Sequence, residues 1–215
     1  MKQFYLVSVP TIQKVVITVV LVLWWLFMPI VGCYPIGIEG GCDQIATHSI
    51  GDGAMGMVAS HVAYMVSHAN FWHLCGNLFV LWMTPNRLYL LEAVTIAFVT
   101  SWLPGVGSIW EVCNNEPIGA TVGFSGVLFA IFGIKWGVYC VGQHQGRISR
   151  RGRVLDEQRT AISGQRLKRF CVRVLPFALI GFFVPHLNWT IHLYSLTAGL
   201  VTGMVRAYNV KYIKA

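Results

Sequence analysis

Charged residues are scarce in this chain. Asp, Glu, Lys and Arg make up 11% of its 215 residues, whereas a soluble domain carries about 25%. Hydrophobic residues make up 55%, and the mean hydropathy is +0.61. Uncharged runs of about 18 or more residues are typical of membrane spans. The composition therefore excludes an ordinary soluble domain and predicts one all-α polytopic membrane domain over residues 1–215.

Lys and Arg are missing altogether from three segments, residues 33–67, 104–122 and 185–191. Most of the 16 basic residues crowd into the stretch 147–173, and others lie near the two ends. Cytoplasmic loops of membrane proteins collect Lys and Arg, so we expect a cytoplasmic basic loop at 142–169. The net charge of +8 then indicates topology and a lipid bilayer as partner, rather than nucleic acid.

Six spans place both termini in the cytoplasm, and every Lys and Arg then lies on the inner side or can snorkel to it. The fourth expected span, 125–141, has 17 residues. At ~1.5 Å per residue it covers roughly 25 Å, less than the ~30 Å hydrocarbon thickness. We therefore expect its outer end to lie in a hydrated recess. The expected spans are 11–31, 71–90, 92–110, 125–141, 170–184 and 189–208.

Several motifs of other protein classes are absent from the sequence. Neither the HExxH zinc motif nor a GxGD-type aspartate occurs, and no convincing internal repeat supports a transporter or channel. A zinc site built from His68, His73 and His192 is conceivable but disfavoured, so we expect neither metal nor cofactor. The expected outer loops contain three cysteines, so one disulfide could form, and the pairing stays open. These cysteines are Cys33, Cys42 and Cys113.

Polar residues converge near the outer ends of three expected spans. Ser125 lies in Gly123-Phe124-Ser125-Gly126 at the head of the fourth span, and His192 lies near the outer end of the sixth. A serine in an apolar helix is commonly a packed residue, and a single His or Asn often serves as an interhelical hydrogen-bond partner. His73 and Asn77 in the second span join them at the same depth. Ionisable groups inside a membrane indicate function, and four such groups at one depth favour a site.

Imidazole can take the proton of a serine hydroxyl near neutral pH. No acidic residue lies at this depth, so we expect a Ser125–His192 dyad. The Ser125 backbone N–H at a helix N-terminus, the Asn77 amide and the His73 ring are candidate oxyanion donors. Two stripes of small residues permit close contact between the fourth and sixth spans. These are Gly126, Ala130, Gly133 and Gly137 in the fourth span, and Ser195, Gly199 and Gly203 in the sixth.

These motifs resemble those of rhomboid intramembrane serine proteases. Gly123-Phe124-Ser125-Gly126 resembles their GxSG motif, the segment from His68 through His73 to Asn77 resembles their second-span pattern, and His192 with Gly199 resembles their sixth span. The resemblance covers roughly residues 10–210. It implies that Ser125 is the nucleophile and His192 the base. It also implies an oxyanion hole of His73, Asn77 and the Ser125 N–H, with His68 supporting the site.

The resemblance further implies a six-helix fold in the cell (inner or plasma) membrane, with the site open to the non-cytoplasmic side. Substrates would be transmembrane helices cut near their outer end, where small or helix-breaking residues weaken the helix. The sequence does not predict the substrate's identity or the oligomeric state. An inactive rhomboid-like protein that binds membrane helices is the alternative. Such proteins typically lose the serine or the base, and both are present here.

The chain departs from the family pattern at four places. Ala59-Ser60 stand near the position of a frequent Trp-Arg pair, and Pro85-Asn86-Arg87 replace the usual end of the second span, with Glu92 further on. Ser195 stands where a glycine is usual, which predicts slightly looser packing. Phe129 stands where a tyrosine is common, and its ring could still pack on His192. None of these departures removes a catalytic atom.

Overall fold

The computed structural model describes residues 9–27, 58–59, 61–68, 70–84, 88–106, 121–144, 172 and 189–213. This part of the chain is helical and contains no strand, in agreement with the predicted all-α class. Over the same residues, none of the helices has both the length and the apolar character that crossing a membrane requires. The helices are α1 (Val9–Phe27), α3 (Phe71–Met83), α4 (Leu90–Thr100), α6 (Ser125–His144) and α8 (Trp189–Ile213).

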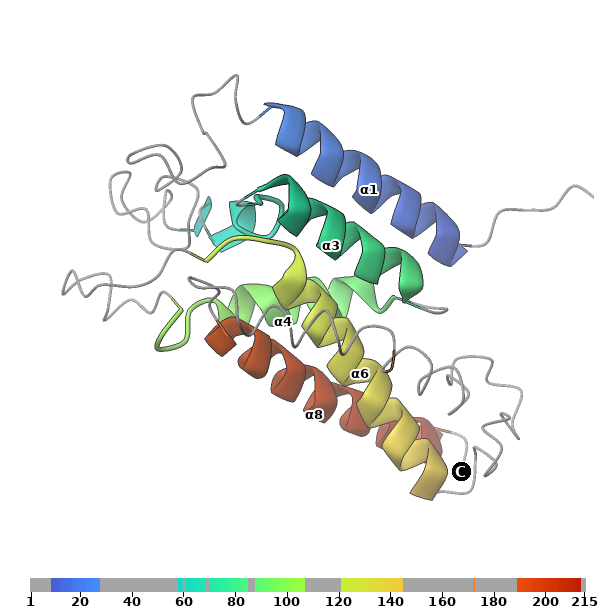
Figure 1. Ribbon diagram of the computed structural model, residues 1–215. Helices are drawn as coiled ribbons and strands as arrows, with labels where there is room; N and C mark the ends of the chain where they lie inside the picture. Colours follow the sequence, from blue (N-terminus) through green and yellow to red (C-terminus); the bar gives the residue numbers. More distant parts are fainter. Residues whose placement is uncertain are drawn as a thin grey trace, which may run out of the picture.

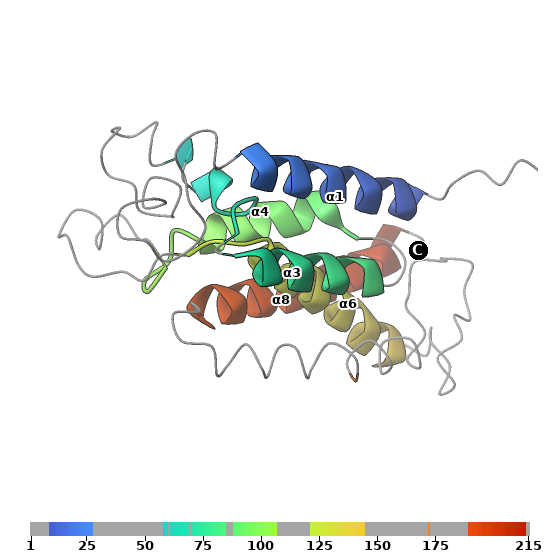
Figure 2. The same cartoon turned by 45° about the horizontal axis from the view of Figure 1, so that its top comes forward.

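The five helices lie side by side in one bundle (Figures 1 and 2). Helices α1 and α4 run in one direction, and α3, α6 and α8 run in the other (Figure 1). As a result, the starts of α3, α6 and α8 and the end of α4 lie at the same end of the bundle, which we call the Ser125 end. The start of α1 and the end of α8 lie at the opposite end (Figures 1 and 2).

Helix α3 ends at Met83, before the end of the expected span 71–90. Its C-cap residue Thr84 is extended, with ψ 118°, because the residue before a proline avoids the helical conformation and Pro85 follows. Helix α4 begins at Leu90, directly after Tyr89 in the left-handed region (φ 53°), and ends at Thr100. Turns follow over 101–106, so the helical part is shorter than the expected span 92–110.

Helix α6 begins at Ser125, as expected, but continues past residue 141 to His144. Its 20 residues cover roughly 30 Å at ~1.5 Å per residue, which equals the hydrocarbon thickness. The helix is therefore three residues longer than the expected span 125–141, and the hydrated recess at its outer end stays a prediction. Helix α8 begins at Trp189, as expected, and has 25 residues.

Some expectations fall on parts of the chain outside the described residues. The expected span 170–184 and the basic loop 142–169 lie almost entirely there, as do Cys33, Cys42 and Cys113. The Ala59-Ser60 departure is described only at Ala59. Cys75 and Cys140 are described, and both are free thiols.

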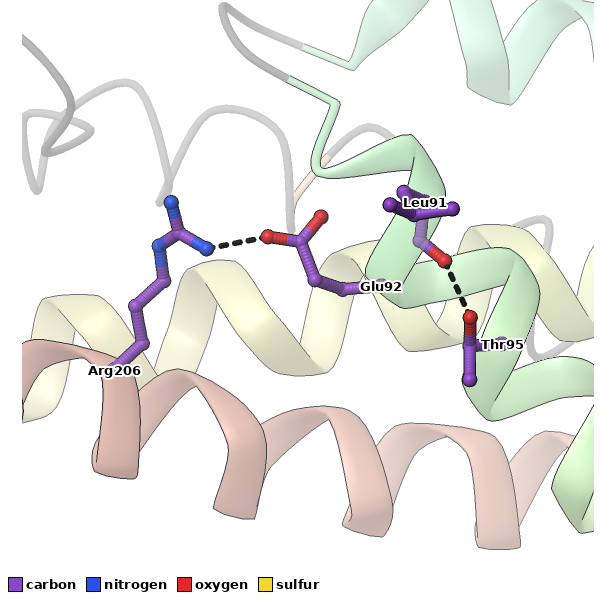
Figure 3. Close-up of polar contacts among 4 residues, drawn as sticks. All are labelled: Leu91, Glu92, Thr95 and Arg206. Atoms are coloured by element: carbon purple, nitrogen blue, oxygen red, sulfur yellow. Dashed lines mark hydrogen bonds and ion pairs between the residues drawn. The ribbon is translucent and has the colours of Figure 1, made fainter.

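Helices α6 and α8 make the most extensive contact of any described helix pair, and α4 packs against both. The apolar core includes Ala97 of α4 and Val127, Ile131 and Ile134 of α6. Helix α4 is also tied to α8 by an ion pair between Glu92 and Arg206 (Figure 3). The extensive contact between α6 and α8 thus brings together the two helices that carry Ser125 and His192.

Candidate functional site

The structure brings Ser125 and His192 together at the Ser125 end of the bundle. The Nε2 atom of His192 lies 2.7 Å from the Oγ atom of Ser125, a normal length for a hydrogen bond to a hydroxyl. Ser125 is the first residue of α6 and His192 is the fourth of α8. With Nε2 accepting the serine proton, the neutral imidazole carries its own proton on Nδ1. This is the arrangement in which a histidine can act as a base toward a serine.

Two aromatic rings hold the imidazole in place. Phe129, one turn after Ser125, stacks on His192 with ring centroids 4.5 Å apart and planes 14° apart. Trp189 meets the imidazole with its edge, at 5.2 Å and 86°. His192 is only 4% exposed, and its Nδ1 has no hydrogen-bond partner among the described residues. The imidazole is thus oriented by packing, without a carboxylate behind it in the described part of the chain.

Glycines let α6 and α8 approach closely enough for this contact. A Cβ atom placed on Gly133 would lie 2.2 Å from the carbonyl oxygen of Leu196, and one on Gly199 would lie 2.4 Å from that of Ala130. Gly137 and Gly203 are equally crowded by backbone atoms of the partner helix. At Gly126 a Cβ would meet Ile191 at an ordinary 3.4 Å. The expected close packing of the two stripes is present, but Gly126 contributes least to it.

His73 and Asn77 of α3 face the backbone just before Ser125. Gly123 has φ +119°, and a Cβ there would lie 2.8 Å from His73 Nε2 and 3.4 Å from Asn77 Nδ2. Only glycine fits this position, because the backbone is in a region that other residues avoid and the two side chains fill the space. The structure therefore places both expected oxyanion donors beside Gly123, two residues before Ser125.

Asn77 is 6% exposed, and its Nδ2 has no hydrogen-bond partner among the described residues. Ser125 begins α6, so its backbone N–H is one of the four that an α-helix leaves without an intrahelical partner. The carbonyl of Phe124 accepts the first helical bond, from Leu128 N. Phe124 is itself buried. The site thus combines a buried side-chain donor with a helix N-terminus, which together suit an anion.

His68 lies beside His73 but is held by its own loop. Its Nδ1 is 3.1 Å from the carbonyl oxygen of Val66, and its ring meets that of His73 edge-on at 5.2 Å. Burial, with His73 nearby, lowers the pKa of His68 to about 3, against the weaker opposing effect of the Val66 carbonyl. His68 is therefore neutral at physiological pH and packs against the site rather than acting on Ser125 directly.

Tyr64 is a site residue that the sequence reasoning missed. Its carbonyl accepts a 2.7 Å hydrogen bond from Gly123 N, and its hydroxyl donates a 2.8 Å bond to the carbonyl of Ala97. The residue is buried and so ties the loop before Ser125 to α4. In the sequence, the hydroxyl of a single tyrosine between apolar neighbours could have indicated that Tyr64 has a buried polar partner.

The structure groups no three or more His, Cys, Asp or Glu side chains in a metal-binding arrangement within the described ranges. The disfavoured trio of His68, His73 and His192 therefore does not form such a group there. The polar side chains around Ser125 are instead arranged as separate donors and one acceptor. That arrangement fits acid–base chemistry on a carbonyl group.

Comparison with known protein families shows a match over most of the chain. The family model of the Rhomboid domain matches residues 55–210, which is more than half of the chain and includes α3, α4, α6 and most of α8. Helix α1 precedes the matched residues. No curated protein and no solved structure shows significant similarity to the chain.

Proposed function

The chain belongs to the rhomboid family, and from that premise we propose that it is an intramembrane serine endopeptidase with Ser125 as nucleophile and His192 as general base. The observation that carries the proposal is the 2.7 Å contact between His192 Nε2 and Ser125 Oγ. A rhomboid-like protein without activity would need no such pairing. The stacking of Phe129 on the imidazole supports the same role.

In the first half of the reaction, Ser125 Oγ attacks the scissile carbonyl carbon and its proton passes to His192 Nε2. The carbonyl oxygen becomes an oxyanion, which the Asn77 amide, the His73 ring and the Ser125 N–H stabilise. Donors fixed in advance are worth most in a site that excludes water. His192 then gives its proton to the leaving amine, and the acyl group stays on Ser125.

In the second half, His192 takes a proton from a water molecule, which attacks the acyl-Ser125 ester. The same donors stabilise the second oxyanion. When it collapses, the new carboxyl group leaves and the proton returns to Ser125 Oγ. No step needs a metal or a cofactor, because His192 mediates all four proton transfers and the chain supplies the oxyanion donors.

The proposed substrate is a transmembrane helix, cut near its outer membrane end. A peptide bond inside a helix is shielded, so a segment with small or helix-breaking residues would open most readily at the site. We further propose that the chain has six spans with both termini in the cytoplasm. The site would then open to the non-cytoplasmic side of the membrane. The uneven distribution of Lys and Arg along the sequence supports this orientation.

The deciding test is labelling of the purified protein in detergent with a fluorophosphonate, which phosphonylates an activated serine. We expect labelling of the wild-type protein and its loss in Ser125→Ala and in His192→Ala. Ser101→Ala is the matched control, because Ser101 Oγ also lies 2.7 Å from an imidazole nitrogen, Nδ1 of His61, but is fully buried. That variant should label like wild type.

A parallel assay follows cleavage of a model transmembrane substrate by the same variants. Cleavage by wild type and by Ser101→Ala, but not by the dyad variants, is the expected result. Wild-type protein that is folded but neither labels nor cleaves would overturn the proposal in favour of an inactive member that binds membrane helices.

A further inference from the structure

Ser195, which stands in place of a usual glycine, makes a buried hydrogen bond one turn after His192. Its Oγ lies 3.0 Å from Oγ1 of Thr100, the last residue of α4. Both residues are buried, and Ser195 is 0% exposed. The hydroxyl therefore has a partner on α4, and the slightly looser packing expected from its added bulk stays a prediction. Residues three apart on a helix share a face, so the bond acts on the face that carries His192.

The direction of this bond follows from the proton count. A hydroxyl has one proton to donate. Thr100 Oγ1 lies 2.8 Å from the carbonyl oxygen of Ile96 and 3.2 Å from that of Ala97, and carbonyls can only accept. The Thr100 proton therefore goes to its own helix, and Ser195 is the donor to Thr100. Ser195→Ala and Thr100→Val each remove this link while keeping nearly the same volume.

The loop that leads to Ser125 is anchored on the same turn of α4. Tyr64 accepts from Gly123 N through its carbonyl and donates through its hydroxyl to Ala97 O. A Cβ on Gly126 would lie 3.4 Å from the Tyr64 hydroxyl and 3.7 Å from Ser195 Oγ. The hydroxyls of both anchors therefore lie close to Gly126, the residue that follows Ser125.

The geometry points to the turn Ile96–Thr100 of α4 as the element that aligns the dyad. Through Tyr64 it fixes the loop before Ser125, and through Ser195 it fixes the face of α8 that carries His192. Ser195, Thr100 and Tyr64 are thus positioning residues. They contact neither substrate nor reacting atoms, and they set the distance between Ser125 Oγ and His192 Nε2. This inference rests on the proposed protease function for its kinetic consequence, but not for the alignment itself.

The kinetic test compares Thr100→Val and Ser195→Ala with wild type in cleavage of a model transmembrane substrate. We expect kcat to fall about 10-fold in each, well within the loss that about 1 Å of misplacement can cause, with KM nearly unchanged. The effects of substitutions within one network are not additive. The double variant should therefore lose no more kcat than the more impaired of the two single variants. Thr100→Ser, which keeps the hydroxyl, should restore kcat.

Thr95→Val is the matched control. Thr95 lies on the same helix and also donates to a carbonyl of its own helix, that of Leu91 (Figure 3). It is exposed. Its removal should leave kcat unchanged. Unchanged kcat in the Thr100 and Ser195 variants, or losses that simply multiply in the double variant, would overturn the inference.

A spectroscopic test separates this inference from the proposed function. In protein labelled with ¹⁵N in its histidine rings, the His192 signal is assigned by its loss in His192→Ala. We expect Ser125→Ala, which removes the partner hydroxyl, to move this signal. Thr100→Val and Ser195→Ala should move it in the same direction, and Thr95→Val should not. A protein without protease activity would still give this answer, and a His192 signal unmoved in both variants would overturn the alignment.

Discussion

Asn77 is the residue whose surroundings are least explained by folding alone. Its Nδ2 is buried without a hydrogen-bond partner among the described residues, although buried polar groups in folded proteins are nearly always paired. The atom lies on the side of α3 that faces Gly123. A donor kept unpaired beside a serine–histidine pair is what an oxyanion that forms only during reaction would require.

We expect Asn77→Ala to lower kcat by about 10²-fold, the usual cost of losing one oxyanion donor. The melting temperature should change little, because no hydrogen bond among the described residues is lost and a buried unpaired group is removed. Cleavage kinetics and thermal unfolding in detergent measure the two effects. An unchanged kcat would remove Asn77 from the oxyanion hole, and a collapse of the melting temperature would make its role structural.

At the scale of single elements, the contact between α6 and α8 was predictable, because it depends on the regular spacing of small residues along each helix. Gly133 and Gly137, like Gly199 and Gly203, recur every fourth residue, and the structure packs backbone against backbone at each of them. The ends of the helices were less predictable. Helix α3 ends just before Thr84, whose extended conformation Pro85 favours. The expected span continued to residue 90, because hydrophobic residues recur beyond the proline.

The anchors on α4 could not be read from the sequence in the same way. The bond between Thr100 and Ser195 joins residues 95 positions apart, and no local pattern pairs a threonine of one helix with a serine of another. Ser195 was expected to loosen the packing because only its size was considered. Its partner became evident once the tertiary structure brought α4 against α8. Long-range polar pairs of this kind depend on the approach of whole helices.

We expect Gly199→Ala to destabilise the protein by about 1–3 kcal/mol, the usual cost of overpacking. The added Cβ would lie 2.4 Å from the Ala130 carbonyl, and two helix backbones must separate to admit it. Gly76→Ala in α3 is the matched control, because nothing lies within 4 Å of a Cβ there. Thermal unfolding should show a loss for the first variant only. Equal melting temperatures would contradict the packing argument.

At the scale of the whole molecule, polar contacts made by Lys and Arg side chains lie at the end of the bundle opposite Ser125. Lys14 of α1 donates to the carbonyls of Trp82 and Thr84 at the end of α3, and its cation is well placed at a helix C-terminus. Arg206 pairs with Glu92 (Figure 3) and lies over the ring of Tyr89, 5.2 Å from its centroid. One end of the bundle is therefore braced by cations, whereas the other carries the neutral groups around Ser125.

Two equally exposed residues at opposite ends allow the orientation of the bundle to be measured. Trp72, at the start of α3, and Leu91, at the start of α4, are each 79% exposed. In a variant whose six native cysteines are replaced, we expect Trp72→Cys to react with a membrane-impermeant maleimide on intact cells. Leu91→Cys should react only after permeabilisation, because the basic end of a membrane protein stays in the cytoplasm.

The proposed orientation would place the start of α1 and the end of α8 in the cytoplasm, since both lie at the end of the bundle opposite Ser125 (Figures 1 and 2). A C-terminal alkaline phosphatase fusion, active only after export, should then be inactive, and a C-terminal fluorescent protein should fluoresce. Labelling of Leu91→Cys on intact cells would contradict the proposed orientation. It would show that the Ser125 end faces the cytoplasm. Substrates would then be cut near their inner ends, while the alignment of Ser125 with His192 would be unaffected.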